Sequence, residues 1–398
     1  MEIPTKYVIA NCKVYAEETI NERGFVLIND GQIADLGKYD DHMNFTNTYV
    51  IELDPSFCIV PGMIDLHIHG ANGSDAMDAT SEALFTIASA LPQEGTTSFL
   101  ATTITQNDEA IEAVLRNVAT YMNDENFDGT AELLGVHLEG PFISSKRAGA
   151  QPLQFISKPD VELFKKWQRA ANGTIKLVTY APELDIDDVF TKYLKDTGVV
   201  PSIGHSDGSY EETMGSIEAG VCHATHLFNQ MKGLHHREPG VVGGVLLNRE
   251  ITAELIADGI HVRPEIIQLT FQQKGKDGII LITDAMRAKY LDNGVFDLGG
   301  QSVTVQEGKA LLEDGTLAGS ILKMNDAMKN MMDYTGCSLA DVISMTSTNA
   351  AKQLHADHRK GSIKKGKDAD LVILNDKLEV QMTICRGKFA YQKEGGFV

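Results

Sequence analysis

The chain has 398 residues, 43% hydrophobic and 23% charged, which is the balance of an ordinary globular protein and excludes a disordered or collagen-like one. A formal net charge of −20 at pH 7 argues against binding to nucleic acid or to an anionic membrane surface. Three further features of the sequence predict a soluble protein of a reducing, cytoplasmic compartment: five scattered cysteines, no basic segment leading into an apolar stretch at the N-terminus, and no apolar run long enough to span a bilayer.

The two ends of the chain share a pattern of short strands. Residues 7–10, 25–28 and 32–36 are apolar runs of strand length, and the Asn-Asp-Gly triplet at 29–31 is a hairpin signal. Residues 370–374 and 381–385 repeat the pattern near the C-terminus. We therefore expect residues 1–58 and 360–398 to form one small β-sandwich domain built from both termini.

Between the two ends, apolar runs of strand length alternate with segments of helical periodicity. Eight such runs occur, at 59–68, 97–104, 133–138, 175–180, 199–203, 221–224, 251–256 and 278–282. Eight strand–helix repeats predict an α/β fold of the (β/α)8 TIM-barrel type over residues 59–359. Hairpin signals interrupt the alternation after the eighth run, so a β insertion is expected near residues 286–316.

Potential metal ligands follow the apolar runs of this predicted barrel. Active sites of such barrels form at the carboxyl ends of the strands. Six candidate groups fall at these ends: His67, His69, Glu139, His205, His226 and Asp284. The first two are two positions apart, so their side chains leave a strand on the same side. Imidazole and carboxylate together suit Zn²⁺, Fe²⁺, Mn²⁺ or a similar ion.

Each of these groups has a simpler structural explanation when it is taken alone. The His-x-His pair suits a polar strand end, Glu139 a helix cap or a buried salt bridge, and Asp284 a helix N-cap. A lone histidine after a strand is more often structural than catalytic. The joint placement of all six groups at strand ends favours a metal centre over six separate structural roles.

Longer motifs around these residues resemble the amidohydrolase superfamily and, within it, the N-acetylglucosamine-6-phosphate deacetylase family. The resemblance covers nearly the whole chain. The matching segments are PGMIDLHIHG at 61–70, HLEGPF at 137–142, GHS at 204–206, THLFN at 225–229, HREPG at 236–240, ADGIH at 257–261, ITDAM at 282–286 and GTLAGS at 315–320. The HLEGPF, HREPG and GTLAGS segments are specific to the deacetylase branch, whereas the His-x-His pair and Asp284 mark only the superfamily.

The resemblance implies hydrolysis of N-acetyl-D-glucosamine 6-phosphate to D-glucosamine 6-phosphate and acetate, in amino-sugar catabolism and recycling. It implies a divalent metal, foremost Zn²⁺, with Fe²⁺, Mn²⁺ or Co²⁺ as alternatives, held by Glu139, His205 and His226, and it makes Asp284 the catalytic carboxylate. Contacts to the sugar and phosphate are expected from Ala150, Asn229, Gln230, Arg237, His261, Leu317, Ala318, Gly319 and Ser320. It further implies a homodimer in which Arg237 reaches the substrate of the neighbouring subunit.

Two features distinguish this chain within the family pattern. Members of the family differ at the His-x-His pair, and this chain keeps both His67 and His69, so one or two metals per subunit are expected. Many superfamily members bridge two metals with a carboxylated Lys after strand four. That segment here reads Thr-Tyr-Ala-Pro at 179–182, so Glu139 would be the bridge. Gln230 stands where a small residue is commoner, which would make the sugar pocket tighter or more polar.

Other functions remain open at the level of sequence. One is an amidohydrolase for a different amide, such as a dihydroorotase-like or an N-acyl-amino-acid hydrolase. Another is a non-catalytic protein that binds a metal or a sugar phosphate. A Schiff-base aldolase on the same barrel would need an inward Lys at a strand end, and the sequence offers none.

Overall fold

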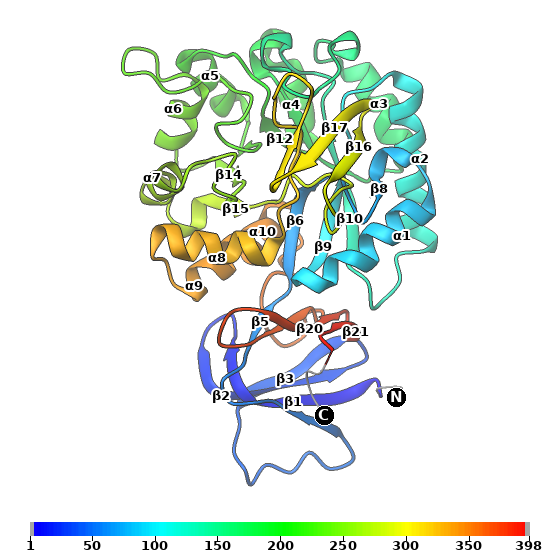
Figure 1. Ribbon diagram of the computed structural model, residues 1–398, viewed down its shortest axis with the longest axis vertical. Helices are drawn as coiled ribbons and strands as arrows, with labels where there is room; N and C mark the ends of the chain where they lie inside the picture. The colour runs from blue at the N-terminus through cyan, green and yellow to red at the C-terminus, as the bar shows by residue number, and fades with distance from the viewer. Residues whose placement is uncertain (1–3, 395–398) are drawn as a thin grey trace.

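The computed structural model describes residues 4–394 and consists of a barrel with a smaller β-sheet beyond one of its ends (Figure 1). In the barrel, eight parallel strands of the described chain follow one another in sequence order. They are β6 (Met63–Ile68), β9 (Thr96–Thr102), β10 (Glu132–Glu139), β11 (Ile175–Tyr180), β12 (Val200–Ile203), β13 (His223–Ala224), β14 (Thr252–Leu255) and β15 (Ile279–Leu281). The predicted (β/α)8 barrel is therefore confirmed.

Backbone hydrogen bonds between the last and first strand regions bring the barrel close to closure. The N–H of Asp284 donates to the carbonyl of His67 at 2.8 Å, and the N–H of His69 donates to the carbonyl of Ala285 at 2.9 Å. The carboxyl end of β6 thereby lies beside the segment that follows β15. Residues more than 200 positions apart in the sequence meet at one rim of the barrel.

The strands are buried because helices surround them on the outside (Figure 1). These are α1 (Ser81–Ala90), α2 (Asp108–Asp124), α3 (Val161–Ala170), α4 (Val189–Asp196), α5 (Tyr210–Ala219), α6 (Gly240–Leu247), α7 (Pro264–Lys274), α8 (Met324–Thr335), α9 (Leu339–Ile343) and α10 (Asn349–Gln353). The helix α2 shows why they form. The Asn107 side chain caps its N-terminus by accepting the Ala110 N–H at 2.9 Å. Its buried Ile111, Val114 and Val118 recur at helical spacing and face the barrel core.

Strands from both ends of the chain share a second, mixed sheet. It comprises β1 (Lys6–Tyr15), β2 (Ile20–Asn29), β3 (Gln32–Lys38), β4 (Tyr49–Glu52), β5 (Cys58–Pro61), β19 (Leu371–Leu374), β20 (Val380–Cys385) and β21 (Lys388–Gln392). Side chains such as Ile9, Ile28, Ile59 and Ile373 form its core. The division into residues 1–58 with 360–398 and residues 59–359 remains a prediction.

The first apolar run of the sequence, 59–68, does not form a single strand. Its start belongs to β5 in the small sheet, and Met63–Ile68 is β6 of the barrel. Gly62 lies between them, and a Cβ atom there would approach the Thr97 hydroxyl to 2.1 Å. The chain crosses from one sheet to the other where only glycine fits, so a continuous apolar run serves two different cores.

Within residues 286–316, where a β insertion is predicted, β16 (Gly294–Leu298), β17 (Gln301–Gln306) and β18 (Lys309–Leu311) form an antiparallel sheet. The short strands β7 (Gly70–Ala71) and β8 (Ser74–Asp75) form a separate hairpin. Buried Leu298 and Val303 of the insertion pack with Ile104, which follows β9. The insertion therefore lies at the same end of the barrel as the strand ends that carry the candidate ligands.

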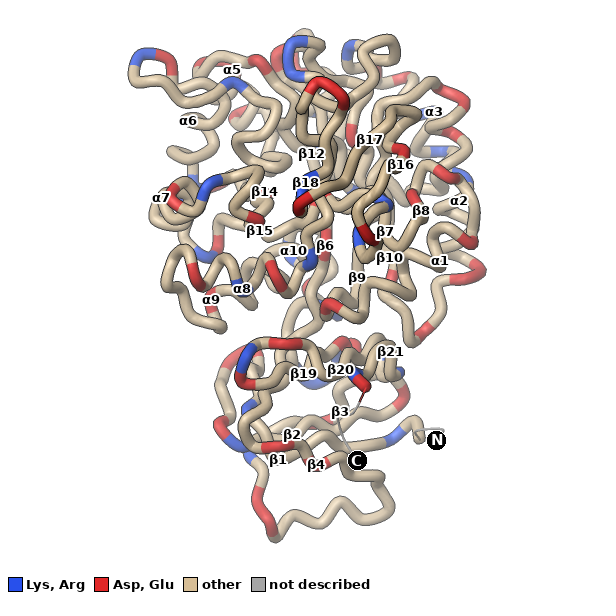
Figure 2. Tube along the Cα trace, viewed as in Figure 1, with Lys and Arg blue, Asp and Glu red and all other residues tan. Residues whose placement is uncertain are grey.

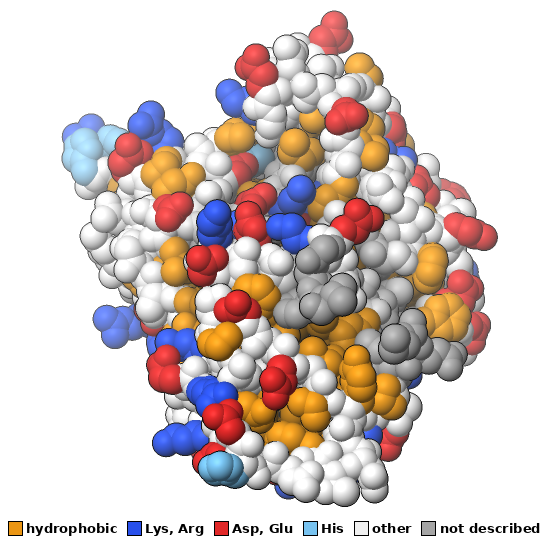
Figure 3. Space-filling view, turned by 60° about the horizontal axis from the view of Figure 1, so that its bottom comes forward, with side chains coloured by type: hydrophobic (Ala, Val, Ile, Leu, Met, Phe, Trp, Pro, Cys, Tyr) orange, Lys and Arg blue, Asp and Glu red, His pale blue; other side chains and the backbone are white. Residues whose placement is uncertain are grey.

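The surface of the described chain mixes charges of both signs. Acidic and basic residues intersperse along the outer helices and around the small sheet (Figure 2). With the small sheet turned forward, hydrophobic side chains appear among charged and polar ones (Figure 3). The exposed ones in that sheet and its loops include Ile20, Met43, Tyr49 and Val50. Across residues 4–394, every helix is too short or too polar to cross a membrane.

Candidate active site with a metal centre

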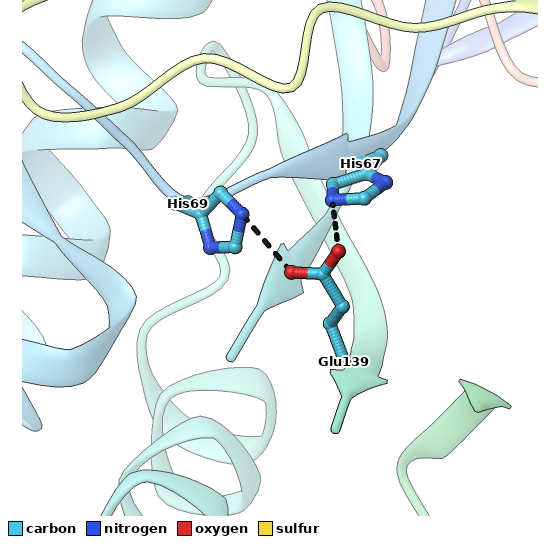
Figure 4. A group of neighbouring side chains, drawn as sticks. All are labelled: His67, His69 and Glu139. Atoms are coloured by element: carbon cyan, nitrogen blue, oxygen red, sulfur yellow. Dashed lines mark ion pairs between the residues drawn. The ribbon is translucent and has the colours of Figure 1, made fainter. Parts of the chain in front are cut away.

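Glu139 lies at the centre of the candidate site and ends β10. Its two oxygens face two different imidazoles, as Figure 4 shows. Oε1 lies 3.6 Å from Nε2 of His67, and Oε2 lies 3.4 Å from Nε2 of His69. All three side chains are buried. His67 of β6 and His69, just beyond its end, thus meet the end of β10, as their spacing in the sequence predicts.

A second group shares the same carboxylate. Nε2 of His205 and Nε2 of His226 each lie 3.1 Å from Oε1 of Glu139, and the two nitrogens are 3.2 Å apart. Ligand atoms around a tetrahedral zinc ion, with bonds of about 2.0–2.2 Å, lie about 3.3 Å from one another. The spacing of these three atoms therefore suits a single metal ion, with Glu139 shared between the two groups.

Hydrogen bonds on the far side of the rings show that both groups fit a cation. Nδ1–H of His205 donates to the carbonyl of Arg147 at 2.7 Å, and Nδ1–H of His67 donates to Oε2 of Glu254 at 3.0 Å. In the neutral rings this leaves lone pairs on Nε2, which face carboxylate oxygens. Nε2 of His67 has no hydrogen-bond partner within the described part of the chain. Lone pairs directed at carboxylates need a cation, either a proton or a metal ion, between them.

Asp284 follows β15 and completes the cluster. Its Oδ1 lies 3.3 Å from Nε2 of His69 and 3.5 Å from Nε2 of His67. The backbones of Asp284, His205 and His226 have φ angles of 47°, 47° and 30°, a left-handed conformation that side chains rarely adopt. The surrounding structure must hold the backbone in this conformation at three strand ends, and such strain is common at functional sites.

The charges of the cluster shift the pKa values of its members in opposite directions. Burial alone would lower the pKa of His67, but the carboxylates of Asp284, Glu139 and Glu254 raise it well above the ordinary value. Burial alone would raise the pKa of Asp284, yet the imidazoles of His67 and His69 lower it to about 2. Asp284 is thus ionised at neutral pH and can accept a proton.

A cavity of about 360 Å³ opens onto these ligands. Ala150, Asn229, Gln230, His261, Leu317 and Gly319 line it, together with the ligands themselves. Ala318 and Ser320 are buried in the wall, where the Ser320 N–H donates to the carbonyl of Asp284 at 2.7 Å. Arg237 lies apart from the cavity, in an exposed loop, and its Nη1 hydrogen-bonds Nε2 of His236 at 2.7 Å. The structure thus gathers most of the predicted residues but not Arg237.

Two residues of the site were missed by sequence reasoning. Nε2 of Gln151 donates to Oε2 of Glu139 at 2.8 Å, and a single Gln in a loop gives no signal of that contact. Glu254 lies inside β14, fully buried, where it accepts from His67. An acidic residue within the apolar run 251–256 was the available signal for it, since a buried carboxylate needs strong partners.

Comparison with known proteins places this barrel and its ligand cluster in a class. The model of the amidohydrolase family matches residues 58–390, so the chain belongs to the amidohydrolase family. That family is metal-dependent, and the described residues of this chain form three groups of candidate ligands: His67, His69 and Glu139; Glu139, His205 and His226; and His67, His137 and Glu254.

Relatives with known names narrow the class further. The chain is 49% identical over 385 residues to an N-acetylglucosamine-6-phosphate deacetylase of Bacillus subtilis (strain 168), covering 96% of this chain and 97% of the relative. The crystal structure of the Thermotoga maritima deacetylase is 34% identical, with a TM-score of 0.87, over 97% of this chain and 100% of that one. A mutant of the Mycobacterium smegmatis deacetylase in complex with N-acetyl-D-glucosamine-6-phosphate is 27% identical, with a TM-score of 0.91, over 98% and 100%. Within the amidohydrolases, the chain is therefore a member of the N-acetylglucosamine-6-phosphate deacetylase family.

Proposed function

We propose that this protein hydrolyses the acetamide of N-acetyl-D-glucosamine 6-phosphate to give D-glucosamine 6-phosphate and acetate, in amino-sugar catabolism and recycling. The observation that carries the proposal is the convergence of Glu139, His205, His226 and Asp284 at the base of one cavity. Its volume of about 360 Å³ suits a ligand the size of a sugar phosphate.

The metal would be held by Glu139, His205 and His226, with His67 and His69 joining Glu139 to hold a second ion. Imidazole and carboxylate ligands favour Zn²⁺, with Fe²⁺, Mn²⁺ and Co²⁺ as alternatives. When bound, such an ion polarises a carbonyl oxygen and lowers the pKa of bound water to about 7. Gln151 holds Oε2 of Glu139 in place by its hydrogen bond, so the shared carboxylate has a defined orientation.

Asp284 is proposed to move the proton. Its carboxylate would accept a proton from the attacking water and return it to the nitrogen of the departing amine. Nδ1–H of His261 donates to Oδ2 of Asp258 at 2.6 Å, which leaves Nε2 free. Burial would lower the pKa of His261, but Asp258 raises it, and a protonated ring can donate to the oxygen that becomes negative during attack.

The phosphate would be bound at the opposite end of the cavity. Asn229, Gln230 and the 317–320 segment are proposed to contact the sugar and phosphate, partly through backbone N–H groups. Arg237 offers a forked donor set suited to phosphate. Its exposed position outside the cavity supports the proposal of a homodimer in which it serves the neighbouring subunit. The cysteines of the described chain are free, in keeping with the proposed cytoplasmic location.

The test is acetate release from N-acetylglucosamine 6-phosphate by metal-stripped protein after addition of Zn²⁺, Mn²⁺, Fe²⁺ or Co²⁺. Free N-acetylglucosamine and N-acetylgalactosamine 6-phosphate are assayed beside it. We expect metal-dependent release that strongly favours the phosphorylated glucosamine derivative. Release from none of these sugars with any metal would overturn the proposal and point to another amide or to a non-catalytic binding role.

A further inference from the structure

Glu254 connects the two candidate metal groups that share Glu139, and with His67 and His137 it forms the third group of candidate ligands. It lies in β14, and its side chain is fully buried. Oε2 accepts Nδ1–H of His67 at 3.0 Å and also the backbone N–H of His226 at 3.1 Å. The main-chain carbonyl of Glu254 accepts the N–H of Leu227 at 2.9 Å. Glu254 therefore holds the ring of His67, which belongs to one group, and the strained backbone of His226, which belongs to the other.

The hydrogen bond to His67 determines which nitrogen faces the site. An ionised carboxylate has no proton to donate, so the ring nitrogen that faces it must be the donor. The proton of neutral His67 therefore lies on Nδ1. Nε2 then presents its lone pair to Glu139 and Asp284, at 3.6 and 3.5 Å. Without Glu254, the ring would be free to rotate or to adopt the other tautomer, and Nε2 would lose its defined direction.

Charge gives a second reason for a carboxylate at this position. Glu139 and Asp284 can neutralise one divalent cation, but a second one adds two positive charges to a buried space. Glu254 is a further buried carboxylate next to the His67 ring. The nearby Asp65 compensates less of the positive charge of a second cation. Its carboxylate accepts a hydrogen bond from the Thr283 hydroxyl, and Lys289 offsets its charge.

We propose that Glu254 is a positioning residue for the second metal ion: it directs Nε2 of His67 into the site and supplies negative charge that allows two cations to bind together. The inference rests on the proposed metal-dependent function, but it concerns metal binding and needs no substrate. Ser202 and His223 lie in the same buried polar layer and bond each other, and Nε2 of His223 lies 3.8 Å from Oε1 of Glu254. Among the described contacts, neither of them reaches Glu139 or Asp284, so the proposal concerns Glu254 alone.

The test measures binding of Co²⁺ and Zn²⁺ alone to metal-stripped protein, by calorimetric titration, metal analysis and the visible spectrum of the Co²⁺ form. Glu254→Gln keeps the size of the side chain and removes its charge. We expect the wild type to bind two ions. In Glu254→Gln, the dissociation constant of the ion held by Glu139, His205 and His226 should stay within about threefold. That of the ion held by His67, His69 and Glu139 should rise about 10–100-fold, the usual effect of losing a partner of a metal ligand.

Two further variants show whether Glu254 acts through His67. Ser202→Ala is the matched control, since it alters the same buried polar layer but should leave both constants unchanged. His67→Ala should abolish the second ion, and Glu254→Gln added to it should have no further effect on the remaining site. If Glu254→Gln does not fold, Glu254→Asp retains the charge and draws the carboxylate away from Nδ1.

Several results would overturn the proposal: a wild type that binds a single ion, a Glu254→Gln or Glu254→Asp protein with both wild-type constants, or equal weakening of both sites. Failure of the proposed function is a separate result. If wild type binds two ions and Glu254→Gln loses one, yet no sugar phosphate is hydrolysed, then the role of Glu254 stands and the substrate assignment falls.

Discussion

Replacing Asp284 with Asn removes the proposed proton acceptor while preserving the shape of the site. The backbone of residue 284 is held by its N–H bond to His67 at 2.8 Å and by the N–H of Ser320, which donates to its carbonyl at 2.7 Å. Both bonds survive the change, so the fold and the left-handed backbone should persist. Asp284 also lies outside the group of Glu139, His205 and His226, so one metal ion should still bind.

The size of the effect follows from the absence of a substitute base. Oε1 of Glu139 faces imidazoles, and Oε2 faces His69 and accepts from Gln151, so that carboxylate is fully engaged. General acid–base catalysis contributes roughly 10²–10⁴-fold, and with no replacement we expect kcat to fall by about 10³–10⁴, or about 4–5 kcal/mol in activation free energy.

The assay is acetate release under saturating sugar phosphate, with metal content measured on the same samples. Asp160→Asn is the matched control, because it makes the same chemical change at the N-cap of α3, where Asn serves equally well. It should retain the wild-type rate. A metal-loaded Asp284→Asn protein that keeps kcat within tenfold of the wild type would refute the assignment of the proton transfer to Asp284.

Three further predictions concern the rest of the molecule. Lys289→Met removes the cationic partner of the fully buried Glu94, which lies 2.7 Å from Nζ of Lys289, and should lower the free energy of unfolding in urea by about 3–5 kcal/mol. Adding Glu94→Gln should restore most of that loss. A double variant no more stable than Lys289→Met would contradict this prediction. Burial would raise the pKa of Glu132, but Arg359 and Lys360 lower it to about 2, below its value in the unfolded chain. The ionised carboxylate therefore stabilises the folded state fully above pH 4.5, and this contribution is lost as the pH falls toward 2. The loss is at most about 3 kcal/mol, at roughly 1.4 kcal/mol per pH unit. Acid unfolding curves of wild type and Glu132→Gln that run parallel would show this to be wrong. Arg237→Ala should raise KM for the phosphorylated sugar about 10–100-fold, which corresponds to the loss of a charge-assisted hydrogen bond of about 1.5–3 kcal/mol. The KM for the free sugar should stay unchanged. Equal losses for both sugars would exclude a phosphate contact.

Much of this protein is determined by local patterns in the sequence. The alternation of apolar runs with helical periodicity predicts the barrel, because each run records burial on the strand itself and requires no knowledge of its neighbours. The turn signals near 286–316 likewise predict the insertion. Six polar groups at strand ends predict one site because parallel strands of a barrel end on the same rim. The metal-ligating and catalytic roles of those six residues stay predictions until the variants are measured.

Tertiary structure decided what depends on contacts between distant segments. The run 59–68 reads as one strand, but Gly62 divides it between two sheets because Thr97 leaves no room for a side chain there. Glu254 reads as an irregularity in an apolar strand, yet closure of the barrel brings it to His67, 187 positions away. Arg237 belongs to a motif of the family but lies outside the cavity of its own chain. Local periodicity reports whether a side chain is buried, whereas its partner is set by the packing of strands far apart in the sequence, and only the folded barrel contains that information.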